Sequence, residues 1–196
     1  MHKPVSPLRW PTAALLAAML AACGGRDEAA AGPGDPAAAT TERARLEALE
    51  AQVAADREAV AGFEVLHARY EHANAPHSGQ RAPAVVVALE NGTAWPVQRV
   101  SLHTRVSVEG EDAPWLDQVF DVPLAATLGP GGGESVTLTP RGDSDWALRA
   151  PPEGTPMRLR VLPVAIETTE GRRLLTEHAF TELQRERLAA LRAGRP

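Results

Sequence analysis

The chain has 196 residues, 44% of them hydrophobic and 23% charged, a composition typical of one globular domain with extensions. Its formal net charge of −5 argues against a nucleic-acid partner, which requires a basic surface. With one cysteine, Cys23, the chain has no internal disulfide.

Residues 1–22 have the organisation of a secretory signal peptide. Lys3 and Arg9 form a basic start, and an uninterrupted apolar run, residues 12–22, follows. This run of about 11 residues is too short to cross a bilayer as a helix, which takes roughly 20. Removing residues 1–22 takes away two basic residues and no acidic one, so the formal net charge falls from −5 to −7. It also removes the only lysine, which excludes Schiff-base chemistry from the remainder.

Cys23 ends the stretch LAAC (residues 20–23), which resembles the lipobox of bacterial lipoproteins. The resemblance implies cleavage before Cys23, a diacylglycerol on its sulfur and an acyl chain on the new amino group. More than one chain holds a protein stably on a membrane, because each buried CH₂ contributes about 0.8 kcal/mol. Gly24 follows the cysteine instead of the aspartate that retains lipoproteins in the inner membrane. The resemblance therefore implies an outer-membrane protein that faces the periplasm.

A linker and a helix are expected next. Residues 23–40, which begin with the lipidated cysteine, are rich in Gly, Ala and Pro without an apolar period, and this predicts a flexible linker. Residues 41–62 predict an α-helix, because good helix formers lie between a Thr40 or Thr41 cap and a terminating Gly62.

The apolar residues of this helix leave two interpretations open. They follow a heptad-like spacing that Asp56 interrupts, and they are Leu46, Leu49, Val53 and Val60. In one interpretation the helix forms a short coiled coil, so that the protein is a homodimer through residues 46–60. In the other it is a stalk that lies partly on the following domain.

Residues 63–180 change to a period of two, which predicts a series of short strands without helices between them. The expected fold is mainly β: an immunoglobulin-like antiparallel β-sandwich, preceded by one long α-helix and followed by a short C-terminal helix and tail, residues 181–196. Residues 84–89 are apolar on both faces, as a central strand would be. In the first strand, one face is predicted to carry Leu66, Ala68 and Tyr70.

A family resemblance agrees with this fold. The runs LENGTAWPVQRVSLHTRV (residues 89–106), APWLDQVF (113–120), LGPGGGESVTLTP (128–140) and SDW (144–146) resemble a group of bacterial lipoproteins with a helical stalk and an immunoglobulin-like β-domain. The resemblance covers residues 84–146 and departs from the group's pattern where three glycines precede Glu134. Its motifs are turns and core anchors, so it implies the fold and no reaction.

The sequence predicts no metal or cofactor site. His67, His72 and His77 are spaced five apart, and odd spacing puts neighbouring residues on opposite faces of a strand. His103 and His178 are expected on exposed strand positions. The glycine-rich run GPGGGES lacks the Gly-Lys-Ser/Thr end of a phosphate-binding loop, and RGDSDW lies in a β region without the partners of an esterase serine. Both runs are interpreted as connections.

Three tryptophans are candidates for an interaction surface: Trp95, Trp115 and Trp146. Tryptophans in such domains most often anchor the core or its ends, and some lie at binding surfaces. The expected function is non-enzymatic, namely binding or scaffolding of an envelope component, with an envelope protein as the partner. Two alternatives remain open: a structural module that self-associates through the helix, and a hydrolase that uses Asp, Glu or Ser.

Overall fold

The structure, a computed structural model, describes residues 36–74, 81–111, 113–140, 146 and 150–194. Cys23, the signal segment and most of the expected linker lie outside these residues. The elements formed by these described residues are two α-helices, a short 3₁₀ helix and seven strands, in the order α1 (Pro36–Asp56), β1 (Phe63–Asn74), β2 (Arg81–Asn91), β3 (Val97–Val108), β4 (Leu116–Leu128), β5 (Gly132–Leu138), β6 (Met157–Thr168), β7 (Arg173–Leu175), η1 (Glu177–Ala179) and α3 (Glu182–Arg192). Neither described helix is long and apolar enough to span a membrane.

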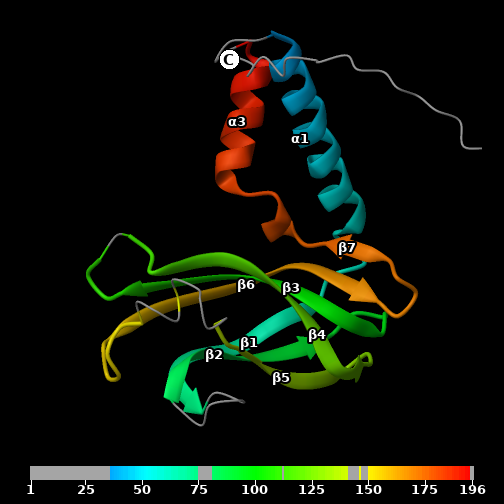
Figure 1. The fold of residues 1–196 in the computed structure, drawn as a ribbon. Coiled ribbons are helices and arrows are strands. Elements are labelled where there is room, and N and C mark those ends of the chain that lie inside the picture. The colour runs from blue at the N-terminus through cyan, green and yellow to red at the C-terminus, as the bar shows by residue number, and fades with distance from the viewer. Residues whose placement is uncertain (1–35, 75–80, 112, 141–145, 147–149, 195–196) are drawn as a thin grey trace, which may run out of the picture. The chain divides into compact units, whose positions relative to one another are not determined.

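The strands form two antiparallel sheets, a three-stranded sheet with the order β1-β2-β5 and a four-stranded sheet with the order β4-β3-β6-β7 (Figure 1). The prediction of a mainly β domain with a helix before and after it is confirmed. β2 is the middle strand of its sheet, as its two apolar faces predicted. β4 pairs with β3 and not with the next strand along the chain, β5, so the β4–β5 connection passes from one sheet to the other.

One hydrophobic core lies between the sheets, because the alternating apolar side chains of both inner faces pack against one another. From β2 and β3 it includes the fully buried side chains Val85, Val87, Leu89, Val100, Leu102 and Val106. The period-two pattern thus placed the centre of the core correctly.

The first strand departs from its predicted pattern. The pairing of β1 with β2 shifts register between Val65 and His67, which is a β-bulge. An extra residue moves the following side chains to the other face, so the core receives Val65, Ala68 and Tyr70. Leu66, expected on the same face as Ala68 and Tyr70, is 58% exposed.

The helix α1 begins and ends earlier than expected. It starts at Pro36, a residue well suited to a first helical position, and the hydroxyls of Thr40 and Thr41 donate to carbonyls four residues back instead of capping it. It ends at Asp56. Gly62 therefore does not end the helix; it has φ = 90° and its carbonyl accepts a hydrogen bond from Gly92 N at 2.8 Å. A Cβ on Gly92 would lie 2.6 Å from that oxygen, so this contact requires glycine.

The apolar stripe of α1 packs against α3 of the same chain (Figure 1). A second hydrophobic cluster, separate from the core between the sheets, contains Leu46, Val53, Phe180, Leu188 and Leu191. Two of the residues expected in a dimer seam, Leu46 and Val53, are thereby buried within one chain. A homodimer through residues 46–60 would have to displace α3.

Ion pairs border this helix pair. Arg187 Nη2 lies 2.8 Å from a carboxylate oxygen of Glu42, and Arg192 lies 3.3 Å from Glu47 and 2.7 Å from Glu50. The hydrogen bond from Arg187 lowers the pKa of Glu42 below its usual 4.5. Folding therefore favours the charged form of Glu42. The stability that this ion pair contributes to the folded state is present above pH 4.5 and is lost as the pH falls below it.

Asp56 connects α1 to the four-stranded sheet. Its Oδ2 accepts hydrogen bonds from Leu175 N at 2.9 Å and from Gln52 Nε2 at 2.8 Å, and the side chain is buried. In the sequence this residue only interrupts the apolar stripe. The structure shows that the interruption is the point where the helix end is fixed to β7.

Candidate functional site

The most distinctive feature of the two-sheet domain is the outer edge of β6. β7 has three residues and pairs with Ala165, Ile166 and Glu167 alone. On the other side, β6 is paired with β3 along almost its whole length. Among the described residues, no strand therefore pairs by hydrogen bonds with residues 157–162 of β6 on the side away from β3, although β1 of the other sheet approaches β6 without pairing with it. We call this segment the free edge of β6.

Local hydrogen bonds explain why β7 stops where it does. Thr176 N donates to the carbonyl of Val164 at 3.1 Å, and Thr176 Oγ1 donates to the carbonyl of Pro163. The same hydroxyl accepts from His178 N at 3.3 Å and so caps η1. The chain turns away from β6 at this cap and continues into α3. His178, expected on a strand, consequently lies in η1.

The backbone of the free edge directs hydrogen-bonding groups outward. Glu109 N donates to the carbonyl of Pro156 at 2.9 Å, so that carbonyl points toward β3. Alternate residues of a strand direct their backbone groups to opposite edges. The N–H and C=O groups that point away from β3 are therefore those of Met157, Leu159 and Val161. The carbonyl of Pro163, which accepts from Thr176, continues this alternation.

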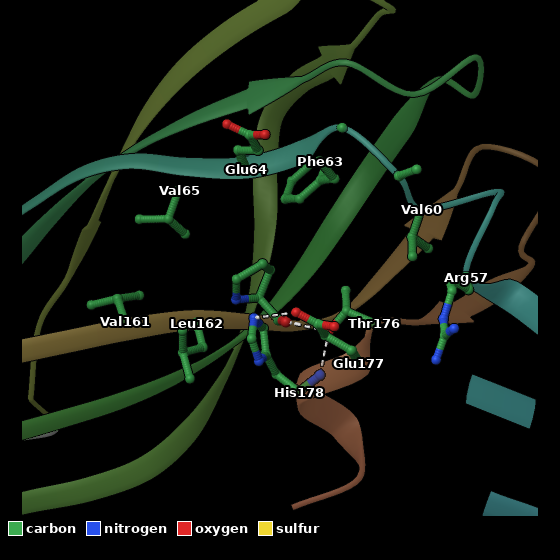
Figure 2. A pocket seen from close by; sticks show the side chains of 13 residues that line it. Arg57, Val60, Phe63, Glu64, Val65, Val161, Leu162, Thr176, Glu177 and His178 are labelled. Carbon is green, nitrogen blue, oxygen red and sulfur yellow. Dashed lines mark hydrogen bonds and ion pairs between the residues drawn. The ribbon is translucent and has the colours of Figure 1, made fainter. Parts of the chain in front are cut away.

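A groove with a cavity volume of about 450 Å³ lies beside the η1 end of the free edge (Figure 2). Its walls are Arg57 and residues 60–65 at the α1–β1 junction, residues 161–163 of β6 and residues 176–178 at η1. Figure 2 shows Val65 of β1 and Val161 of β6 pointing toward each other across it, while Glu64 points away. The groove thus has an apolar floor between the edge strands of the two sheets.

Ionisable side chains lie at the rim of this groove. Arg57 approaches from the end of α1, and His178 Nε2 lies 3.8 Å from Glu177 Oε1 (Figure 2). The combination of an apolar floor, charged rim and unpaired backbone suits an extended peptide better than a small reactive substrate.

The polar residues around Ser101 and His103 on the outer face of the four-stranded sheet form two separate groups. His103 Nε2 lies 2.6 Å from Asp117 Oδ1. Ser101, two residues away on the same strand, donates its hydroxyl proton to Asp121 and accepts from Arg173 Nη2 at 3.2 Å. No hydrogen bond joins Ser101 to His103 in the described part of the chain, so these side chains are not arranged as a nucleophile and its base.

The three candidate tryptophans do not gather on one surface. Trp146 is 3% exposed, and its ring lies 6.2 Å from that of Trp115, which is half-buried and packs on the core. Trp95 precedes β3 and Trp115 follows it, which puts them at opposite ends of that strand. Trp95 is half-buried, with Arg172 4.9 Å from its ring centroid. All three pack on the core between the sheets, Trp115 and Trp146 next to each other and Trp95 apart from them.

Around Trp115, an aromatic cluster contains three buried polar atoms that have no hydrogen-bond partner among the described residues. They are Tyr70 Oη, Trp115 Nε1 and Trp146 Nε1. Burial raises the pKa of Tyr70 above its usual 10. The ring contacts of these residues, which are edge-on, make this end of the core largely aromatic.

The expected metal-ligand candidates are dispersed. His67 and His72 lie on β1, and His77 is outside the described residues. Within those residues, no three His, Cys, Asp or Glu side chains are grouped closely enough to hold a metal ion. Sequence reasoning did not find the free edge of β6. The available signal was the short apolar run of RRLLTEHAF, which is too brief to pair with all of β6.

Comparison with known proteins assigns no relative: no family model matches the chain, and no curated protein matches it.

Proposed function

We propose that this protein is a lipid-anchored protein of the bacterial envelope that binds an extended segment of another envelope protein. The anchor is the lipidated Cys23, and the location is the periplasmic face of the outer membrane. The lipobox-like stretch before Cys23 and the acidic composition of the chain support this location. The role is binding or scaffolding and not catalysis.

The domain that binds is proposed to be an immunoglobulin-like β-sandwich. Seven antiparallel strands divided between two sheets support this class. In the seven-stranded constant-type arrangement, the fourth strand pairs with the fifth, whereas here β4 pairs with β3. The last strand is also reduced to three residues. This second departure is the one that gives the domain its proposed function.

The proposed mode of binding is strand addition along the free edge of β6. The observation that carries it is that no strand is hydrogen-bonded to residues 157–162 on the side away from β3, beside a groove of about 450 Å³. An added strand would pair with the backbone groups of Met157, Leu159 and Val161 and lie in the line that a longer β7 would have taken.

β1, one edge of the other sheet, is less suited to this role. Its bulge at residues 65–67 interrupts regular pairing. A bulge is one of the features by which natural sheets prevent strand addition. The free edge of β6 has no such bulge within residues 157–162.

Site-specific photocrosslinking in cells tests the binding mode. A photoreactive amino acid replaces Leu162, which lines the groove, and in a matched strain it replaces Leu183, which is 75% exposed on α3. The expected result is a discrete crosslinked protein at position 162 and a weaker or absent one at position 183. Equal crosslinking at both positions, or none at 162, would contradict strand addition.

The anchor is tested separately. Cys23→Ser removes the sulfur that would carry the lipid, so the protein is expected to move from the membrane fraction to the soluble periplasmic fraction. Intact-mass measurement should show the loss of the acyl groups. Unchanged fractionation together with an unchanged lipid mass would overturn the lipoprotein proposal without bearing on the groove.

A further inference from the structure

Two arginines on the free edge of β6 point to the chemistry of the segment that binds there. Arg158 and Arg160 are exposed and alternate with the inward-facing residues of that strand. In the register of β3 and β6, Arg160 lies directly opposite Arg105, and Arg158 lies opposite Ser107. These four residues and Glu111 line a shallow pocket of about 360 Å³. The outer face therefore concentrates three guanidinium groups beside the free edge.

This concentration is unfavourable in the isolated chain. Like charges directly opposite each other on neighbouring strands destabilise a sheet. Elsewhere on the same sheet, each arginine of β3 and β7 has a carboxylate within 4.0 Å: Arg99 with Glu167 at 3.5 Å, Arg105 with Asp117 at 3.5 Å, and Arg173 with Asp121 at 3.9 Å. Arg158 and Arg160 have no ion-pair partner among the described residues. The chain as a whole is acidic, and these two neighbouring arginines can therefore pair with an anionic group of a partner.

A strand added to β6 would place its side chains in two sets. Those on the inner face would lie next to Met157, Leu159 and Val161, which pack toward the core. Those on the outer face would lie next to Arg158 and Arg160, at the cross-strand distance where opposite charges attract. The alternation of inner and outer side chains along β6 would thus determine which kind of side chain suits each position of the added strand.

We infer that the segment recognised by this protein alternates apolar residues with acidic residues, the acidic side chains pairing with Arg158 and Arg160. This inference rests on the proposed strand addition and adds to it the composition of the partner. Charge complementarity selects the acidic segment, and the net negative charge of the rest of the chain confines its binding to this edge.

Three synthetic peptides test the inference against the purified full-length chain. Each has valine at alternate positions, and the positions between carry glutamate, glutamine or lysine. Binding affinity is measured by titration, and the site is read from changes in the backbone amide NMR signals of Met157, Leu159 and Val161. The glutamate peptide is expected to bind about three- to tenfold more tightly than the glutamine peptide, from two added cross-strand ion pairs. The lysine peptide should bind most weakly, and high salt should reduce the differences.

Two double variants that remove the same charge test whether Arg158 and Arg160 cause the preference for the acidic peptide. The double substitution Arg158→Gln with Arg160→Gln should abolish the preference for glutamate over glutamine. The control is Arg43→Gln with Arg45→Gln, at two exposed positions of α1. It removes the same charge and should leave the preference for glutamate unchanged.

The outcomes separate the two proposals. If the glutamate and glutamine peptides both shift the β6 amides with equal affinity, or if the control variant loses the preference as well, the acidic partner is overturned and strand addition remains. If none of the peptides shifts the β6 amides, strand addition is overturned and this inference with it.

Discussion

Asn91→Ala is expected to lower the free energy of unfolding by about 3–5 kcal/mol, because it leaves several buried polar groups without partners. Asn91 is 0% exposed at the end of β2. Its Nδ2 donates to the carbonyls of Trp95 and Leu128, both at 2.8 Å, and its Oδ1 accepts from the backbone N and the hydroxyl of Thr93 at 3.1 and 2.7 Å. One side chain therefore joins the end of β2 to the end of β4 and to the loop before β3.

Two further variants make this prediction specific, and urea denaturation followed by circular dichroism measures all three. Asn91→Asp keeps the acceptor for Thr93 but cannot donate to the two carbonyls, so it should destabilise at least as much as alanine. Gln98→Ala, which loses a partly buried bond to Glu167 at 2.8 Å, should cost about 1 kcal/mol or less. A free energy for Asn91→Ala within about 1 kcal/mol of the unchanged protein would contradict the proposed bridging role.

Leu46→Ala is expected to lower the free energy of unfolding by about 3 kcal/mol and to loosen the contact between α1 and α3. Leu46 is 1% exposed and packs with Leu188 and Leu191 in the cluster between the helices. A cavity there cannot be filled from the core between the sheets, because the two clusters are separate. Denaturant unfolding gives the loss of stability, and hydrogen exchange at α3 amides reports the loosening.

Leu183→Ala is the matched control, since it removes the same side chain from an exposed position of α3. Its effect is expected to stay within about 0.5 kcal/mol. Equal effects of the two substitutions would show that Leu46 is not covered by α3. Sedimentation of both variants adds the oligomeric state, and concentration-dependent dimerisation of the unchanged chain would favour the coiled-coil interpretation instead.

The candidate site could not be predicted from the sequence, because it is defined by the absence of a paired strand along one side of β6. Each strand's own alternation shows which side chains face the core, so the residues that flank the groove, such as Val65 and Val161, could be recognised as strand residues. Whether β6 has a partner on both sides depends on where β7 ends. That end is set by the bonds of Thr176 to Pro163 and Val164, which join segments 12 or 13 positions apart in the sequence.

The sequence by itself determined the local structure: strands where apolar residues alternate, a central strand where both faces are apolar, and helices at both ends of the strand series. These features depend on the periodic spacing of side chains along one segment. It also specified the lipobox-like stretch, whose meaning does not depend on the fold.

Only the tertiary structure decided which surfaces cover one another. It assigned the apolar stripe of α1 to α3, turned Asp56 from an interruption into a link to β7, and exposed Leu66 through a bulge. It also left residues 157–162 of β6 without a hydrogen-bonded strand on the side away from β3. The physical reason is that hydrophobic pattern encodes which side chains must leave water, while the surface that receives them is set by long-range packing and hydrogen bonds.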